Sequence, residues 1–567
     1  MNVSPTLQNE FLLERGKLDP LGIWRVSDRM ITHLFRPFTT VVTARPARYF
    51  SFYCWAIDWC TKKHARGTKE QFWRDFFRLE TAFLCSVYLH SQSGHAYSFT
   101  GAIGVDGAAS HLAKSGDSVA VDQRIRNGWE ANYKSPMQVY DLYEISTETL
   151  GTVVLRDNGL RLAANFEESI RETDYYKHCL NSISIPKAVL SNFATAACPC
   201  LLKKGEGAIA LERKALRSVL VKPSKSNATP FDPEGLRTLE TSLNLLLLGM
   251  HSMHTKGIRL THGRWRTLTM FGGIVHDGRW VELTCAASHL PVLARWRWFQ
   301  FQSVLVYCLE ASLAEFLRWL STRTEASRES EVECWALGSV QKGLTEICAD
   351  LGAQVPDIKQ LSVRDLVSVL VPDWQSLAAI EESNKEKLSR RYSLLVERHH
   401  AATQAQHAGG VLASSYALFL YIVGVFHQVY KNTPDDAIGF YQSTASWDGD
   451  EVSLPKLVET VYMDMDQSKK AVLTDFWDSF FLLLVKSRQL RTRANRGKEV
   501  AWFSVLRELS ADEDFIQWEN DYVPNEFRGP REPVAIGMLV NLDLVEETEE
   551  GWGLTQAGAD YCMRLLT

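Results

Sequence analysis

The chain has 567 residues, enough for about three or four domains, and its 46% hydrophobic and 23% charged residues are typical of a globular protein. The N-terminus lacks a basic stretch followed by an apolar run, and no apolar run reaches the roughly 20 residues that a membrane helix needs. Eleven scattered cysteines indicate reduced core thiols and no disulfide framework. We therefore expect a cytoplasmic protein that does not bind a membrane.

The charge is distributed unevenly. Residues 499–567 hold 15 Asp and Glu against 4 Lys and Arg, while the other 498 residues hold 58 basic against 52 acidic residues. The terminal segment therefore carries −11 and the rest +6. This asymmetry predicts that the two parts meet different partners, or each other.

The first 55 residues contain Leu21-Gly-Ile, Pro37-Phe-Thr-Thr and Arg45-Pro-Ala-Arg48-Tyr-Phe. In these motifs the chain resembles an uncharacterised bacterial family found in mobile-element and phage-defence neighbourhoods. The resemblance implies a role in defence and no particular reaction. From the residues alone, we interpret Arg45 and Arg48 as neutralising helix ends or buried carboxylates beside an aromatic core helix.

Residues 68–91 have the apolar stripe of an amphipathic helix, and after a Gly- and Ser-rich loop the chain reads helical again until Leu142. Residues 142–163 then repeat a pattern found near the C-terminus, with Leu155 aligned on Leu554 and Gly159 on Gly558. At the C-terminus an apolar helix ends at Asn541, two short strands flank an acidic turn, and Thr555 caps a last helix. Both segments resemble a winged helix.

The middle of the chain combines a basic stretch, a small β patch and a series of helices. Residues 183–235 are basic and loop-rich, a helix spans 234–254, and a small antiparallel β patch lies near 264–284 with its turn at Asp277-Gly278. The pattern from 289 to 431 is helical, including a Glu/Lys-rich exposed helix at 381–400. Residues 432–455 are the clearest linker.

The sequence thus predicts a mainly α, multidomain protein with winged-helix-like modules near 105–170 and 499–567. The first expected divisions are an N-terminal helical segment (1–104), a winged-helix-like module (105–180) and a basic segment with the hairpin (181–290). A helical domain (291–431), a linker (432–455), helices with a basic tract (456–498) and the acidic terminal module (499–567) follow.

Motifs that would name a reaction are missing: there is no phosphate-binding Gly-rich loop, no metalloprotease His-Glu pair and no nucleophile elbow. We expect no cofactor and no catalytic residue. The weak candidates for zinc are His178, Cys179, Cys198 and Cys200, whose spacing is tighter than that of ordinary zinc knuckles.

Two basic tracts are candidates for binding nucleic acid, because Lys and Arg neutralise phosphates while Trp and Arg planes can stack on bases. Core packing of the tryptophans is the alternative for the second tract. The candidate residues are Lys486, Arg488, Arg491, Arg493, Arg496 and Lys498 in the first tract and Arg264, Arg266, Arg295 and Arg297 in the second.

The terminal module carries acids where a DNA-reading wing needs cations, so it is expected to dock on protein, either a partner or this chain's own tract at 486–498. Its docking candidates are Glu546, Glu547, Glu549, Glu550 and Trp552. The function that fits best is a non-catalytic adaptor or DNA-associated subunit of a bacterial assembly. A nuclease with an unrecognised active site and a transcriptional regulator are the alternatives.

Overall fold

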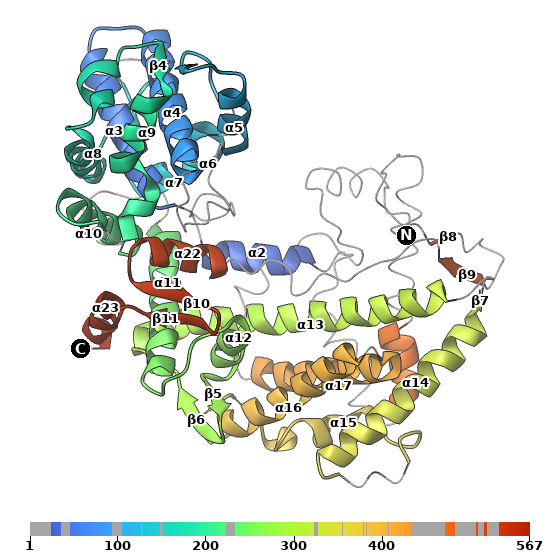
Figure 1. The fold of residues 1–567 in the computed structure, drawn as a ribbon. Coiled ribbons are helices and arrows are strands. Elements are labelled where there is room, and N and C mark those ends of the chain that lie inside the picture. The colour runs from blue at the N-terminus through green and yellow to red at the C-terminus, as the bar shows by residue number, and fades with distance from the viewer. Residues whose placement is uncertain are drawn as a thin grey trace. The chain divides into compact units, whose positions relative to one another are not determined.

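The computed structural model is drawn as a ribbon in Figure 1. It describes residues 24–35, 46–92, 105–125, 128–147, 151–203, 205–222, 233–322, 327–431 except five single positions, 471–481, 506–507, 515–518 and 532–566. These residues are mainly helical with small antiparallel sheets, as predicted. The chain forms two compact units: unit 1 comprises 1–31, 262–283 and 293–529, and unit 2 comprises 32–261, 284–292 and 530–567.

Unit 2 is built on two packed helices, α3 (Arg48–Lys63) and α4 (Lys69–Ser91). Helix α4 confirms the helix predicted at 68–91. Its start is fixed by Thr68, whose hydroxyl accepts from the Gln71 N–H while the Gln71 side chain accepts from the Thr68 N–H. Between the helices, the rings of Phe52 and Phe83 stack with centroids 3.9 Å apart. This aromatic layer is the core on which the next elements pack.

The N-terminal hairpin module (residues 105–170) follows. Its elements are α5 (Val105–Ala113), β1 (Ser118–Ala120), α6 (Trp129–Asn132), α7 (Lys134–Val139), β2 (Tyr143–Ile145), β3 (Val153–Leu155) and α8 (Asp157–Ile170). The prediction of continuous helix up to Leu142 is wrong, because residues 118–120 pair antiparallel with β4 (Ser184–Pro186). The hairpin of β2 and β3 followed by a helix is confirmed.

Residues 183–235 are more helical than predicted. After the π-helical turn η1 (Tyr175–Cys179) and β4, the elements are α9 (Lys187–Ala197), the 3-10 turn η2 (Pro199–Lys203) and α10 (Ala208–Leu220). The basic residues had suggested loops, but α10 buries Ala215, Leu216, Val219 and Leu220 along one face and keeps its cations on the other. The next helix, α11 (Pro233–His254), confirms the prediction at 234–254.

The C-terminal hairpin module (residues 532–566) completes unit 2. It consists of α22 (Glu532–Asn541), β10 (Val545–Thr548), β11 (Gly551–Leu554) and α23 (Gln556–Leu566). The helix end at Asn541 and the cap at Thr555 are both as predicted, since the Thr555 hydroxyl accepts from the Gly558 N–H at 3.1 Å. In Figure 1 the module is red and lies against the green helix α11.

Unit 1 contains the predicted β patch in part. Strands β5 (Gly273–His276) and β6 (Arg279–Glu282) pair around Asp277 and Gly278, which take the positive φ angles of a tight hairpin turn. Residues 264–271, predicted as strand, belong to helix α12 (His262–Phe271) instead. Trp265, Leu268 and Phe271 lie three residues apart and are buried together, so helical spacing prevails over the polar–apolar alternation.

The helices predicted between 289 and 431 are present. After the 3-10 turn η4 (Ala287–His289) of unit 2 they are α13 (Leu290–Ser321), α14 (Glu329–Asp350), α15 (Val363–Leu370), α16 (Lys385–Gln404) and α17 (Ala408–Lys431), with the short η5 (Trp374–Ser376). Helix α17 packs against both α14 and α16 (Figure 1). The segment Gly409–Val429 is long and apolar enough to span a membrane, but 89% of its most apolar stretch is buried, as in a core helix.

The remaining described elements are short. The helical ones are α2 (Trp24–Leu34), α20 (Val472–Asp475) and the π-helical turn η6 (Phe476–Phe481). Strands β7 (Ser327–Arg328), β8 (Leu506–Arg507) and β9 (Phe515–Trp518) form one three-stranded sheet. Within the predicted helices at 456–492, residues 472–481 are helical, Ala471 forms an antiparallel bridge with Ser362, and the others lie outside the described residues. The predicted linker at 432–455 also lies outside them.

Candidate functional site: the docked C-terminal hairpin

The hairpin of the C-terminal module has a fixed register. Val545 pairs with Leu554 and Thr548 with Gly551, and the chain leaves α22 through Asp543, which has a φ of 55°. The outer strand β11 does not end the sheet, because Leu260 and Trp552 form an antiparallel bridge with backbone hydrogen bonds of 2.9 Å in both directions. The hairpin is therefore docked, through its backbone, on the segment that follows α11.

Two glycines make this close approach possible. A Cβ on Gly551 would lie 2.6 Å from the Leu260 carbonyl oxygen, and a Cβ on Gly553 would lie 1.6 Å from Arg259 Nη1. Gly551 also has a φ of 128°, which L-residues rarely adopt. The Gly551-Trp-Gly553 stretch is thus the contact surface for residues 259–260.

Charged side chains close the same interface. Arg259 Nη1 donates to Glu546 Oε1 at 2.5 Å. Arg217, from α10, donates to the Leu542 and Asp543 carbonyl oxygens at 2.6 and 2.9 Å and lies 3.3 Å from the Asp543 carboxylate. Burial is the main cause that lowers the pKa of the Arg217 guanidinium, with the nearby charge of Arg213 adding to it. The acidic hairpin therefore covers two cations of its own chain.

The terminal helix α23 adds contacts of the same kind. The Lys222 ammonium lies 4.7 Å from the centre of the Tyr561 ring, a cation–π distance, and the Tyr561 hydroxyl donates to Asn244 of α11 at 3.0 Å. The sequence predicted only a basic, loop-rich segment at 183–235, whereas Arg217 and Lys222 of this segment contact the C-terminal module.

The predicted docking residues divide into two groups. The Glu546 side chain contacts Arg259, and the Trp552 backbone pairs with Leu260. Glu547 accepts from the Trp552 indole at 3.2 Å and, like Glu549 and Glu550 at the tip, is exposed. The tip therefore presents three acids to solvent while the base of the hairpin is engaged.

The two hairpin modules share their local geometry. Asp141 and Asp543 have φ angles of 56° and 55° at the same place, directly before the first strand. A Cβ on Gly159 would lie 2.1 Å from the Leu142 oxygen, and one on Gly558 would lie 2.0 Å from the Leu544 oxygen. The alignment of Gly159 on Gly558 made from the sequence is confirmed, because both glycines let the last helix touch the start of the hairpin.

The second predicted nucleic-acid tract is mostly core. Trp265 and Trp296 are fully buried, and their rings pack edge to face with centroids 5.3 Å apart. The prediction that bases stack on them is therefore wrong, and the alternative of core packing is confirmed. Arg266 is only 5% exposed, which removes it from any surface that phosphates reach. Arg264 and Arg295 are half-buried.

Arg297 and the first tract complete the comparison with the predicted nucleic-acid residues. Arg297 donates to the Met270 carbonyl at 2.8 Å, and burial lowers its pKa to about 10. It therefore serves the packing of α13 on α12 rather than an open surface. The first tract, Lys486, Arg488, Arg491, Arg493, Arg496 and Lys498, lies outside the described residues.

The interpretation of Arg48 as a partner of a buried carboxylate is confirmed. Its Nε lies 3.0 Å from Glu212 of α10, and both side chains are fully buried. Arg48 also donates to the Cys198 carbonyl and to the Ser169 hydroxyl, at 2.9 and 2.7 Å. One guanidinium thus joins α3, α8, α10 and the turn after α9, which sequence reasoning could not specify. Arg45 lies outside the described residues.

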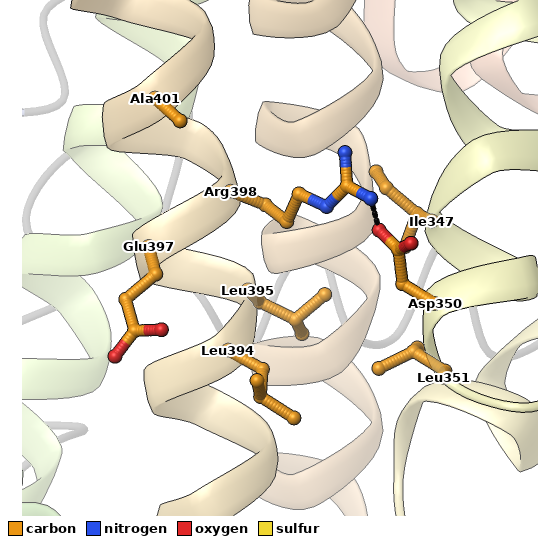
Figure 2. A pocket seen from close by; sticks show the side chains of 8 residues that line it. All are labelled: Ile347, Asp350, Leu351, Leu394, Leu395, Glu397, Arg398 and Ala401. Carbon is orange, nitrogen blue, oxygen red and sulfur yellow. Dashed lines mark ion pairs between the residues drawn. The ribbon is translucent and has the colours of Figure 1, made fainter.

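A pocket of about 350 Å³ lies in unit 1 between α14 and α16. Figure 2 shows Arg398 reaching across it to an ion pair with Asp350, above the apolar side chains of Leu351, Leu394 and Leu395. The nearby His399 is buried between the Ser414 and Tyr307 hydroxyls. Burial lowers the pKa of His399 to about 4, so it is a neutral core residue.

Comparison of the chain with the profiles of known protein families, with curated proteins and with solved structures gives no match. The docked hairpin is therefore interpreted from its own geometry and charge.

Proposed function

We propose that the chain is a non-catalytic adaptor or nucleic-acid-associated subunit of a bacterial multiprotein assembly, located in the cytoplasm, with a role in phage defence as the N-terminal resemblance implies. In this proposal the two hairpin modules are winged-helix-like binding modules. The observation that supports it best is the pairing of Glu546 with Arg259. An acidic hairpin on a cationic segment is a contact that phosphates compete with.

Each of the two covered cations lies close in sequence to an exposed cation. Lys256 lies three residues before Arg259, and Lys214 lies one helical turn before Arg217; both lysines are exposed. Release of the hairpin would join Arg217 and Arg259 to these lysines, which raises the local positive potential. The hairpin thus acts as an internal competitor of nucleic acid.

The tip of the hairpin supports the protein-docking half of the proposal. Glu549 and Glu550 are exposed and stand next to the exposed Glu547. Such a cluster repels phosphates and attracts a basic protein surface. A partner that binds the tip could draw the hairpin away from Arg259, which would couple partner binding to nucleic-acid binding.

Fluorescence anisotropy with labelled single-stranded and duplex DNA of random sequence tests the nucleic-acid half. Arg259→Gln should weaken binding and reduce the slope of log Kd against log salt by about one, the effect of losing one phosphate contact. Lys62→Gln is the matched control, because it removes one exposed cation that is paired with Asp58 on α3. No binding by the wild-type protein even at low salt would overturn this half.

The same preparation separates the alternatives. A regulator would bind its own promoter far more tightly than random duplex. A nuclease would cut DNA with multiple turnovers when a divalent metal is added. Co-purification of the native protein, compared with the Glu549→Gln/Glu550→Gln variant, tests the docking half: a subunit that remains bound to the variant as tightly as to the wild type would contradict docking through the tip.

A further inference from the structure

Three groups that bind soft metal ions meet where α4 and α9 end. His90 lies in the last turn of α4, and Cys198 and Cys200 lie on either side of Pro199 in the turn after α9. The ligand atoms of the three side chains all lie within 4.8 Å of one another. His178 and Cys179, the other zinc candidates from the sequence, lie on η1 and do not belong to this group, so their pairing with Cys198 and Cys200 is wrong.

The local fold explains why two cysteines one residue apart can face the same point. The Cys198 N–H still donates to the Ala194 carbonyl, but Cys198 itself is extended and ends the helix. Pro199 cannot continue the helix and begins the tighter turn η2. This change of direction brings the Cys198 and Cys200 sulfurs within hydrogen-bonding distance of each other. Helix α4 packs against α9, which places His90 beside them.

The surroundings suit two thiolates. The Cys198 thiol donates a hydrogen bond to the Cys200 sulfur, and the positive charge of Arg48 acts on both sulfurs. Arg48 does not leave the region with excess positive charge, because Glu212 neutralises it at 3.0 Å. The two positive charges of a divalent cation would be neutralised by the two thiolates alone.

We propose that His90, Cys198 and Cys200 bind one Zn²⁺ ion, with a fourth position left for water or an added ligand. Bonds from zinc of about 2.3 Å to sulfur and about 2.0 Å to nitrogen place ligand atoms about 3.5–3.8 Å apart, so the distances between the ligand atoms must contract by up to about 1 Å. Both cysteines bind zinc as thiolates, so binding displaces the protons of the Cys198 and Cys200 thiols, and these protons go to solvent. The ion would join the ends of α4 and α9.

The test uses the full chain, purified with and without zinc in the growth medium and analysed for bound metal by mass spectrometry. We expect one zinc per chain, and we expect Co²⁺ added to metal-stripped protein to give the visible absorption of a tetrahedral thiolate site. Cys200→Ser and His90→Ala should lose this absorption. Cys179→Ser should keep it, because Cys179 is a half-buried thiol outside the group.

A second measurement does not depend on the folding of any variant. In the wild-type protein, Zn²⁺ should slow alkylation of Cys198 and Cys200, mapped by peptide mass spectrometry, and leave the alkylation of the exposed Cys334 unchanged. Substoichiometric zinc together with no cobalt absorption would overturn the proposal. Equal protection of Cys334 would overturn it as well, because the metal would then bind without selecting the site.

Discussion

Arg259 donates to Glu546 across 287 positions of the sequence, from the segment after α11 to the first strand of the terminal hairpin. Gly553 directly opposite has no side chain, and any Cβ there would overlap the guanidinium. The two residues therefore form part of one docking surface, together with the backbone bridge between Leu260 and Trp552. The acidic segment was expected to dock on a partner or on this chain's own tract at 486–498, and in the described residues it contacts Arg217 and Arg259 of its own chain.

The paired glycines of the two modules give a prediction on stability. Gly558→Ala places a Cβ about 2.0 Å from the Leu544 carbonyl oxygen, and Gly159→Ala places one about 2.1 Å from that of Leu142. Because backbone must move in both cases, each change should lower the free energy of unfolding by about 1–3 kcal/mol in urea titrations. Gly116→Ala is the control, since nothing lies within 4 Å of its Cβ position. An equal loss in all three variants would contradict the steric explanation.

The buried pair of Arg48 and Glu212 gives a second prediction. Glu212→Gln leaves the guanidinium buried without a counter-charge, which should cost about 3–5 kcal/mol of unfolding free energy. Lys62→Met breaks the exposed pair with Asp58 and should cost about 0.5 kcal/mol or less. Chemical denaturation monitored by tryptophan fluorescence measures both. Similar costs for the two variants would mean that burial of the pair does not matter.

The secondary structure near each hairpin could be predicted because its causes are local. Asn541, Thr555 and Gly558 define a helix end, a cap and a close approach within twenty residues of one another, and the same signals recur around Gly159. Residues 264–271 were misread for an equally local reason: their polar–apolar alternation resembles a strand, although Trp265 and Leu268 also fit a helix.

The sites depend on contacts that no local pattern encodes. Nothing near Cys198 in the sequence points to His90, which comes from a helix more than a hundred positions earlier. Nothing near Arg217 and Arg259 in the sequence points to their partners Asp543 and Glu546, which lie beyond position 540. The clue that was available was the charge asymmetry between residues 499–567 and the rest of the chain. It predicted that the two parts meet each other or different partners, without showing where.

A buried carboxyl in unit 2 gives a prediction on pH. Burial is the main cause that raises the pKa of Glu80 to about 7, although the Tyr53 hydroxyl and the Trp129 N–H donate to it at 2.8 and 2.6 Å. Between about pH 4.5 and pH 7 the folded state binds more protons at this site than the unfolded state. The free energy of unfolding should therefore fall as pH rises through this window, by on the order of 3 kcal/mol.

Glu80→Gln removes the titrating group and keeps an oxygen that accepts both hydrogen bonds. This variant should lose that decrease between pH 5 and pH 8, measured by urea unfolding, and should be more stable than the wild type at pH 8. The control is Glu168→Gln, an exposed carboxylate paired with Arg171. We expect this control to keep the wild-type pH dependence. If the free energy of unfolding of Glu80→Gln still falls as pH rises, another group causes the decrease.

The most direct test of the docked hairpin compares two variants that change the net charge equally. Glu546→Gln breaks the pair with Arg259, whereas Glu549→Gln removes an exposed acid from the tip of the same hairpin. In anisotropy titrations with labelled DNA at low salt, Glu546→Gln should bind up to about fivefold more tightly than wild type, the equivalent of roughly 1 kcal/mol for a half-exposed ion pair. Glu549→Gln should bind like the wild type. Equal tightening in both variants, or none in either, would contradict competition between the hairpin and nucleic acid for Arg259.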